Sequence, residues 1–142
     1  MTTFNTSREI AASPEEVFAA FSDAARLARW WGPTGFTNTF HTFEFETGGR
    51  WIYTMHSPHS GNPENESVFE LVGPHKIIIR HVSQPLYRLT IDLTPTVTGS
   101  LVSWSQEFDD AEVARRIEKI VIPANEQNLD KLTAEVLARR PR

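Results

Sequence analysis

Seven large side chains, six of them aromatic, are the residues of this sequence most able to hold a small organic molecule. Aromatic rings bury large apolar areas, and tyrosine and tryptophan each add one polar atom. Seven such side chains are difficult to pack without a gap, and an apolar gap with a few polar groups is typical of a ligand site. The alternative is an ordinary hydrophobic core. The set comprises Trp30, Trp31, Phe36, Trp51, Tyr53, Met55 and Trp104.

Glu70 is the acid whose position best suits general acid or base chemistry. In a strand it shares a face with Val68 and Val72, and if that face points inward, burial perturbs the pKa of the carboxyl group. The opposite register places Phe69 and Leu71 in the core and Glu70 in water. Both faces are apolar enough to be buried, so the pattern leaves the two registers open.

His81 and Asn128 are two further polar residues at apolar positions. His81 follows Ile77 and Ile79 on one face of a predicted strand, so it can point into the same interior. We favour a hydrogen-bonded structural histidine over a catalytic one. Asn128 lies in the apolar stripe of a predicted helix, so its amide must bond to carbonyl groups freed by Pro123 or to a ligand. The first of these is the simpler assumption.

The sequence contains no motif of a metal site, a nucleophile or a phosphate-binding loop. It has no cysteine, which excludes disulfide bonds, thiolate nucleophiles and cysteine zinc sites. His56 and His59 lie three residues apart, but without a carboxylate at metal-binding spacing. Glycine-rich phosphate loops and the Gly-x-Ser-x-Gly elbow are absent as well. We therefore expect no metal and no cofactor, and we assign no catalytic residue.

Length and charge narrow the class of protein. The 142 residues suit one domain over residues 1–142. A formal net charge of −4 has the wrong sign for neutralising phosphates, so nucleic acid is not an expected partner. No apolar run approaches the ~20 residues of a membrane span, and the amino terminus lacks the pattern of a signal peptide. We expect a cytoplasmic protein.

Two capped segments near the amino terminus predict short helices. Ser13 precedes Pro14 and lies three residues before Glu16, which is the pattern of a capping box. Ser22 and Asp23 can start a second short helix, and the Gly-Pro pair that follows the two adjacent tryptophans ends it.

Beyond these helices the apolar residues alternate with a period of two, which predicts a sheet. Strands are expected at about residues 50–56, 66–72, 77–82, 86–94 and 100–108, with a further Phe/Thr-rich strand before Gly48. Trp51, Tyr53 and Met55 share one strand face. We expect this face to point toward the C-terminal helix, and Ile52 and Thr54 to point away.

Asp109 followed by Glu112 is another capping pattern, and it opens a helix expected to reach about Arg139. Pro123 removes one backbone donor, which predicts a kink in the turn before it. The helix should cover the sheet with one apolar stripe. The residues of this stripe are Val113, Ile117, Val121, Ala124, Asn128 and Leu132.

Four segments, in this order, resemble the bacterial proteins related to activators of the heat-shock-protein-90 ATPase. They are residues 12–18 (ASPEEVF), 28–33 (ARWWGP), 48–51 (GGRW) and 125–132 (NEQNLDKL). That family belongs to the START-like (SRPBCC) superfamily. The resemblance implies an α+β helix-grip fold, in which a curved antiparallel sheet of six or seven strands packs on one long C-terminal helix, with two short helices after the first strand. It also implies a cavity between sheet and helix, which in relatives receives lipids, steroids, aromatic polyketides or plant hormones.

The function we favour is non-enzymatic binding of an apolar, ring-containing small molecule of the lipid, steroid or aromatic polyketide class in this cavity. One alternative is an enzyme resembling polyketide cyclases, in which Glu70, His81 or Tyr53 moves protons. Another is a co-chaperone-like module with a protein partner, which should expose a contiguous apolar patch. The expected binding site consists of the seven large side chains together with Glu70, His81, Val121, Ala124 and Asn128.

Overall fold

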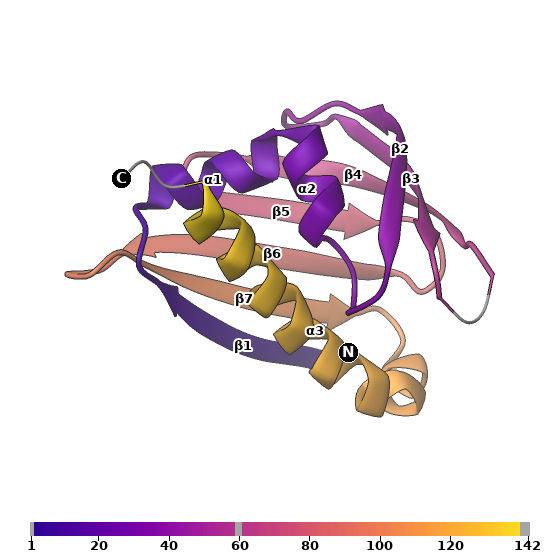
Figure 1. Ribbon diagram of the computed structural model, residues 1–142. Coiled ribbons are helices and arrows are strands. Elements are labelled where there is room, and N and C mark those ends of the chain that lie inside the picture. The colour runs from indigo at the N-terminus through magenta and orange to yellow at the C-terminus, as the bar shows by residue number, and fades with distance from the viewer. Residues whose placement is uncertain (1, 59–60, 140–142) are drawn as a thin grey trace.

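The computed structural model describes residues 2–58 and 61–139 (Figure 1). In these residues, seven strands form one antiparallel sheet in the order β1-β7-β6-β5-β4-β3-β2. The elements in chain order are β1 (Thr2–Ile10), α1 (Pro14–Ser22), α2 (Ala24–Trp30), β2 (Thr37–Phe43), β3 (Arg50–His56), β4 (Glu64–Val72), β5 (Lys76–His81), β6 (Tyr87–Pro95), β7 (Ser100–Phe108) and α3 (Ala111–Ala138).

The long helix α3 crosses one face of the curved sheet, and α1 and α2 lie beside it on the same face (Figure 1). The sheet has seven strands, and the two short helices follow the first strand. The predicted α+β helix-grip class is therefore confirmed. None of the helices in residues 2–58 and 61–139 is long and apolar enough to cross a membrane.

The two short helices begin where their capping residues predict. The Ser13 hydroxyl accepts a hydrogen bond from the Glu16 N–H (3.2 Å), and the Glu16 carboxylate accepts one from the Ser13 N–H (2.9 Å). This is the expected capping box. Asp23 caps α2 by accepting from the N–H of Ala25 (3.0 Å). Each cap satisfies backbone donors that the first helical turn leaves without partners.

The predicted cap of α3 is wrong by one residue. Asp110, not Asp109, accepts from the Glu112 N–H (2.9 Å) and starts the helix. Asp109 directly follows β7 and still bonds to the sheet, because its N–H donates to the carbonyl group of Leu86, the residue before β6 (3.1 Å). Its carboxylate pairs with Arg80 (2.7 Å). Where two aspartates are adjacent, the sequence pattern cannot tell which of them caps the helix and which still bonds to the preceding strands.

The predicted inward face of β3 is confirmed. Trp51 and Tyr53 are almost completely buried, whereas Ile52 and Thr54 on the other face remain partly exposed. Met55 continues the inner face and packs against the core. The alternation therefore fixes which side of this strand faces the interior, because neighbouring side chains point to opposite faces.

The buried stripe of α3 is only partly the predicted one. Leu132 and Asn128 are buried, but Val113 and Ile117 in the first turns remain partly exposed. The helix is rotated relative to the expected stripe, and four further residues complete its buried face. These are Ala114, Asn125, Leu129 and Val136. The helix continues through Pro123.

Glu135 joins α3 to α2 through a cluster of arginines. Its carboxylate accepts hydrogen bonds from Arg26 (3.0 Å), Arg29 (3.0 Å) and Arg139 (3.3 Å). These bonds, above all the one from Arg29, lower the pKa of Glu135 to about 2. The Glu135 side chain is only 10% exposed, so water screens the cluster weakly.

Replacing Glu135 with glutamine is expected to lower the free energy of unfolding by about 1 to 2 kcal/mol near neutral pH. Folding lowers the pKa of this carboxyl group, so its stabilisation is present above the unfolded value of about 4.3. It is lost as the pH falls through the folded value of about 2. Urea unfolding at about pH 7 and about pH 3 should therefore show a smaller difference between variant and wild type at the lower pH.

Glu112→Gln is the matched control on the same helix. The Glu112 side chain is 71% exposed and lies 3.9 Å from Arg115, so its removal should leave the unfolding curve unchanged. Equal losses in the two variants would contradict the role assigned to the arginine cluster.

Candidate functional site

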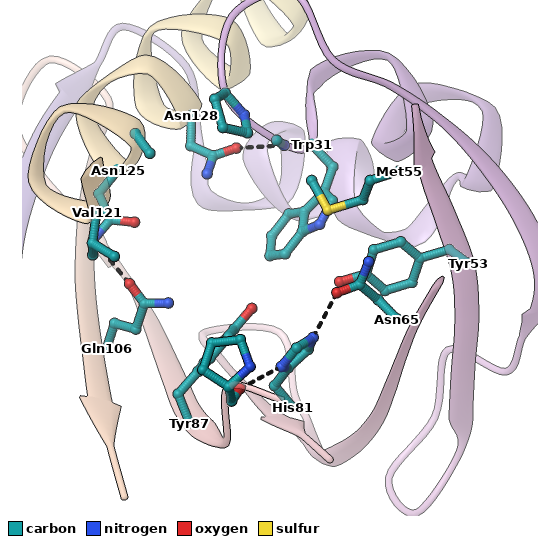
Figure 2. A pocket seen from close by; sticks show the side chains of 14 residues that line it. Trp31, Tyr53, Met55, Asn65, His81, Tyr87, Gln106, Val121, Asn125 and Asn128 are labelled. Atoms are coloured by element: carbon teal, nitrogen blue, oxygen red, sulfur yellow. Dashed lines mark hydrogen bonds between the residues drawn. The ribbon is translucent and has the colours of Figure 1, made fainter. Parts of the chain in front are cut away.

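A cavity of about 170 Å³ lies between the inner face of the sheet and α3 (Figure 2). Strands from both halves of the sheet, the segment after α2 and the middle of α3 contribute to its wall. The lining residues are Trp31, Gly32, Pro33, Tyr53, Met55, Asn65, His81, Pro85, Tyr87, Gln106, Val121, Ala124, Asn125 and Asn128.

One side of the cavity is apolar and rigid. Trp31 packs edge-on against Trp51 (centroids 4.9 Å apart), and Trp51 stacks on Tyr53 (4.4 Å). Met55 extends this side toward the segment after α2, where its methyl group lies close to Gly32. Burial raises the pKa of the Tyr53 hydroxyl group, so this group stays protonated. The aromatic side therefore offers apolar contact area without a charge.

His81 forms the floor of the cavity and is fully engaged. Its Nδ1 donates to the carbonyl oxygen of Pro85 (2.7 Å), and its Nε2 accepts from the Ser83 hydroxyl group (3.3 Å) and lies beside the amide group of Asn65. The ring stacks on Tyr87 with centroids 4.5 Å apart. Burial lowers the pKa of His81, which favours the neutral ring near pH 7. The histidine is hydrogen-bonded within the protein, as expected, and it also lines the cavity.

The side opposite the aromatic rings carries amide groups. Asn125 on α3 donates from Nδ2 to Oε1 of Gln106 on β7 (3.1 Å). Asn128, one turn later, accepts from the backbone N–H of Gly32 with its Oδ1 (2.8 Å). The protein partner of Asn128 is therefore not a carbonyl group near Pro123, one of the two expected partners, but a backbone donor 96 residues away.

Seven of the twelve residues expected in the site line the cavity. They come from α3, from β3, from β5 and from the segment after α2. They are Trp31, Tyr53, Met55, His81, Val121, Ala124 and Asn128.

Three tryptophans of the expected site do not line the cavity but support its wall. Trp30 donates from Nε1 to the carbonyl group of Ala20 (2.9 Å) and packs against Trp31. Trp104 lies on the other side of Trp31, with ring centroids 6.2 Å apart, and Trp51 is completely buried. For these three rings the ordinary core is the correct interpretation. Phe36 is partly exposed beside Gly32 and is also outside the lining.

The expectation that Glu70 points into the interior is wrong. Glu70 is exposed, and Arg88 donates to its carboxylate (2.6 Å), which lowers the pKa of Glu70. Ser67 and Phe69 are the buried residues of β4, so alternation alone places Glu70 on the outer face. A bulge lies at this point, because Phe69 pairs with Ile79 and Leu71 with Ile78. The bulge also reverses the alternation, so that Val72 packs against the core.

Seven lining residues were not named from the sequence: Gly32, Pro33, Asn65, Pro85, Tyr87, Gln106 and Asn125. For two of them a signal was present. Tyr87 begins the clearest alternating run of the chain, and Gln106 shares a strand face with Trp104 and Phe108. The amide of Asn125 could not be found by periodicity, because the rotation of α3 decides which side faces inward.

Metal ligation finds no support in the described residues. In residues 2–58 and 61–139, no group of three or more histidine or acidic side chains could hold a metal ion. The Nε2 of His56 hydrogen-bonds the Thr39 hydroxyl (2.7 Å). His59 lies outside the described residues.

A curved sheet that holds a long C-terminal helix, with a cavity between them, defines a START-like helix-grip protein. Residues 11–136 match the family described as "Activator of Hsp90 ATPase homolog 1-like protein", and the chain belongs to this family.

Solved structures from several bacteria share the fold. A protein of Chromobacterium violaceum is 24% identical, with a TM-score of 0.84 over 94% of this chain and 96% of that one. An AHSA1 protein of Silicibacter pomeroyi is 22% identical, with a TM-score of 0.77 over 98% of this chain and 100% of the other. A comparison with curated proteins found no match. At these identities the likeness establishes the fold alone.

Proposed function

We propose that the chain binds a ring-containing small molecule, in the cytoplasm, in the cavity between α3 and the sheet. The observation that carries this proposal is the cavity of about 170 Å³, with an aromatic side and an amide side. An engineered apolar cavity of about 150 Å³ in another protein binds benzene, so one ring fits a space of this size. The aromatic side supplies apolar contact, and the amide side supplies orientation.

The groups that could move protons are not poised to do so, which favours binding over catalysis. Both ring nitrogens of His81 have partners within the protein, the carbonyl oxygen of Pro85 for Nδ1 and the Ser83 hydroxyl group for Nε2. Glu70 lies on the outer face of the sheet. Burial raises the pKa of Tyr53, which makes its hydroxyl group a poor base. Within the described lining, no carboxylate takes their place.

The size of the cavity limits how the expected ligand classes can bind. Pockets that enclose a drug-sized molecule occupy about 300 to 1,000 Å³. A lipid, a steroid or an aromatic polyketide would therefore place one ring or one chain segment inside and the remainder at the mouth. A ring that loses ~200 Å² of apolar surface gains about 5 kcal/mol before association costs are subtracted, so single-ring compounds should bind weakly.

Weak binding calls for a method that maps contacts at high ligand concentration. Amide chemical shifts of the labelled protein, recorded against a library of single-ring compounds, should change in a saturable way around Trp31, Met55 and Asn128. Native mass spectrometry of freshly purified protein should also show a retained small molecule when a natural ligand is bound tightly. If no compound produces saturable shifts at these residues, the aromatic side is ordinary core and the proposal fails.

A further inference from the structure

Given that the cavity binds a small molecule, as proposed above, we propose that its ligand is a neutral single-ring compound that carries a carbonyl oxygen. The ring would lie against Trp31, Tyr53 and Met55. The oxygen would accept hydrogen bonds from two of the three donor groups that face it, those of Gln106, Asn128 and Tyr87. This assignment follows from the donor groups that the protein leaves without partners, from the absence of charge in the described lining, and from the cavity volume.

Two buried amide groups present donors to the cavity. Gln106 and Asn128 are each only 8% exposed, and each uses its side-chain oxygen to accept a bond from the protein. Their amide nitrogens have no hydrogen-bond partner among the described residues. Figure 2 shows both nitrogens directed toward the space in front of the Trp31 ring. Neither nitrogen is among the buried side-chain atoms that lack a partner, so both are open to the cavity, where the acceptor of a ligand can reach them.

Tyr87 adds a third donor. Figure 2 shows its hydroxyl group pointing into the cavity, with no hydrogen bond to another of the lining residues drawn. Burial raises the pKa of Tyr87 well above its ordinary value, so the hydroxyl group stays protonated and can donate. Asn125 offers the opposing acceptor with its Oδ1, since its Nδ2 donates to Gln106. The three donors of Gln106, Asn128 and Tyr87 thus outnumber the acceptor of Asn125. A ligand that fits them needs an acceptor atom, and a carbonyl oxygen can accept two hydrogen bonds with its two lone pairs.

The electrostatics of the cavity favour a neutral ligand. Its described lining contains no lysine, arginine, aspartate or glutamate, and burial keeps His81 neutral near pH 7. Lys131 lies outside the lining and donates to the carbonyl groups of Gly32 and Pro33 (3.2 and 3.4 Å). A carboxylate in this space would lose its hydration without gaining a counter-charge, and such desolvation is costly.

Three probe compounds of similar size test separately whether the ligand needs a carbonyl oxygen and whether it must be neutral. Acetophenone has a ring and a carbonyl oxygen, ethylbenzene has nearly the same shape without the oxygen, and benzoate carries a charge. Dissociation constants from amide-shift titrations should place acetophenone about tenfold or more below ethylbenzene, since each new hydrogen bond contributes about a three- to tenfold change. Benzoate should bind more weakly than both.

Two variants assign the preference to the donors. Gln106→Leu removes one donor, and Tyr87→Phe removes another with little effect on packing, so at least one variant should retain the fold. Each should weaken acetophenone about three- to tenfold and leave ethylbenzene within about twofold. Gln127→Leu is the matched control, because the Gln127 oxygen accepts from the exposed N–H of Thr34 (3.0 Å) outside the cavity lining.

The outcomes separate this inference from the function on which it rests. If acetophenone and ethylbenzene bind in the cavity with equal affinity, or if benzoate binds best, the cavity binds small molecules but the carbonyl assignment is overturned. The same conclusion follows if both donor variants bind acetophenone as the wild type does. If none of the three probes shifts the cavity amides and the wider library also fails, the proposed function itself is overturned.

Discussion

Replacing Trp51 with alanine is expected to lower the free energy of unfolding by about 3 to 5 kcal/mol. The side chain is completely buried and stacks between Tyr53 (centroids 4.4 Å apart) and Phe69 (5.6 Å, planes 8° apart). Trp31 packs edge-on against it at 4.9 Å. Phe40 and Phe43 also contact the ring, so its removal leaves a void lined by five aromatic rings, and such closely packed surroundings collapse only partly. Urea unfolding followed by circular dichroism measures the loss.

Two substitutions calibrate this expectation. Trp51→Phe keeps one ring in the stack and removes an indole N–H that has no partner among the described residues, so it should cost much less, about 1 to 2 kcal/mol. Phe36→Ala removes a ring that is partly exposed, and we expect a loss below that of Trp51→Ala. A Trp51→Ala protein that unfolds within about 1 kcal/mol of the wild type would show that the stack is not the support of the cavity wall.

Replacing Asn128 with alanine is expected to cost about 2 to 3 kcal/mol, because it leaves the buried N–H of Gly32 without a partner. Gln127→Ala provides a close comparison. The neighbouring side chain on α3 also accepts from a backbone N–H of the same loop, that of Thr34 (3.0 Å). There water can replace the lost acceptor, since Thr34 is exposed. We expect a loss below about 0.5 kcal/mol for that variant.

Asn128→Ala and Gln127→Ala should also differ in their effect on the structure of the cavity wall. Amide shifts of Gly32 and Met55 should move in Asn128→Ala but not in Gln127→Ala. The glycine has φ +97°, and a Cβ added to it would lie 3.0 Å from the Met55 methyl group. The left-handed backbone of Gly32 therefore lets the loop lie close to Met55, and hydrogen bonds to Asn128 and Lys131 hold it there. Equal effects of the two variants on stability would contradict a specific role for Asn128.

Local chemistry made most of the fold predictable from the sequence. Helix caps depend on residues three apart, as in Ser13 and Glu16, and the inward face of β3 depends on simple alternation. Both features act over a few residues. The two adjacent aspartates before α3 show the limit of such patterns, because the hydrogen bond from Asp109 to Leu86 decides where the strand ends.

The site was less predictable because its geometry depends on contacts between distant segments. The register of β4, which buries Ser67 and Phe69, places Glu70 on the outer face, and a bulge reverses the alternation after it. The amide of Asn128 was recognised as needing a partner, but the partner lies 96 residues away. The excess of aromatic rings indicated a cavity, yet three of the tryptophans fill the core behind it. Periodicity predicts which face of a strand or helix points inward, but it cannot predict which of the inward residues line the cavity.

The most direct test of whether the cavity is the binding site is to fill it with a larger side chain introduced on α3. Ala124 lines the cavity, whereas Ala134 is exposed on the same helix, so Ala124→Phe and Ala134→Phe form a matched pair. Val121→Phe is a second filling variant in case the first fails to fold, which circular dichroism reports. Each protein is titrated with the single-ring compound that shifts the wild-type cavity amides most. We predict saturable binding to the wild type and Ala134→Phe, and none to a folded filled variant; undiminished binding to a folded filled variant would contradict the assignment of the site.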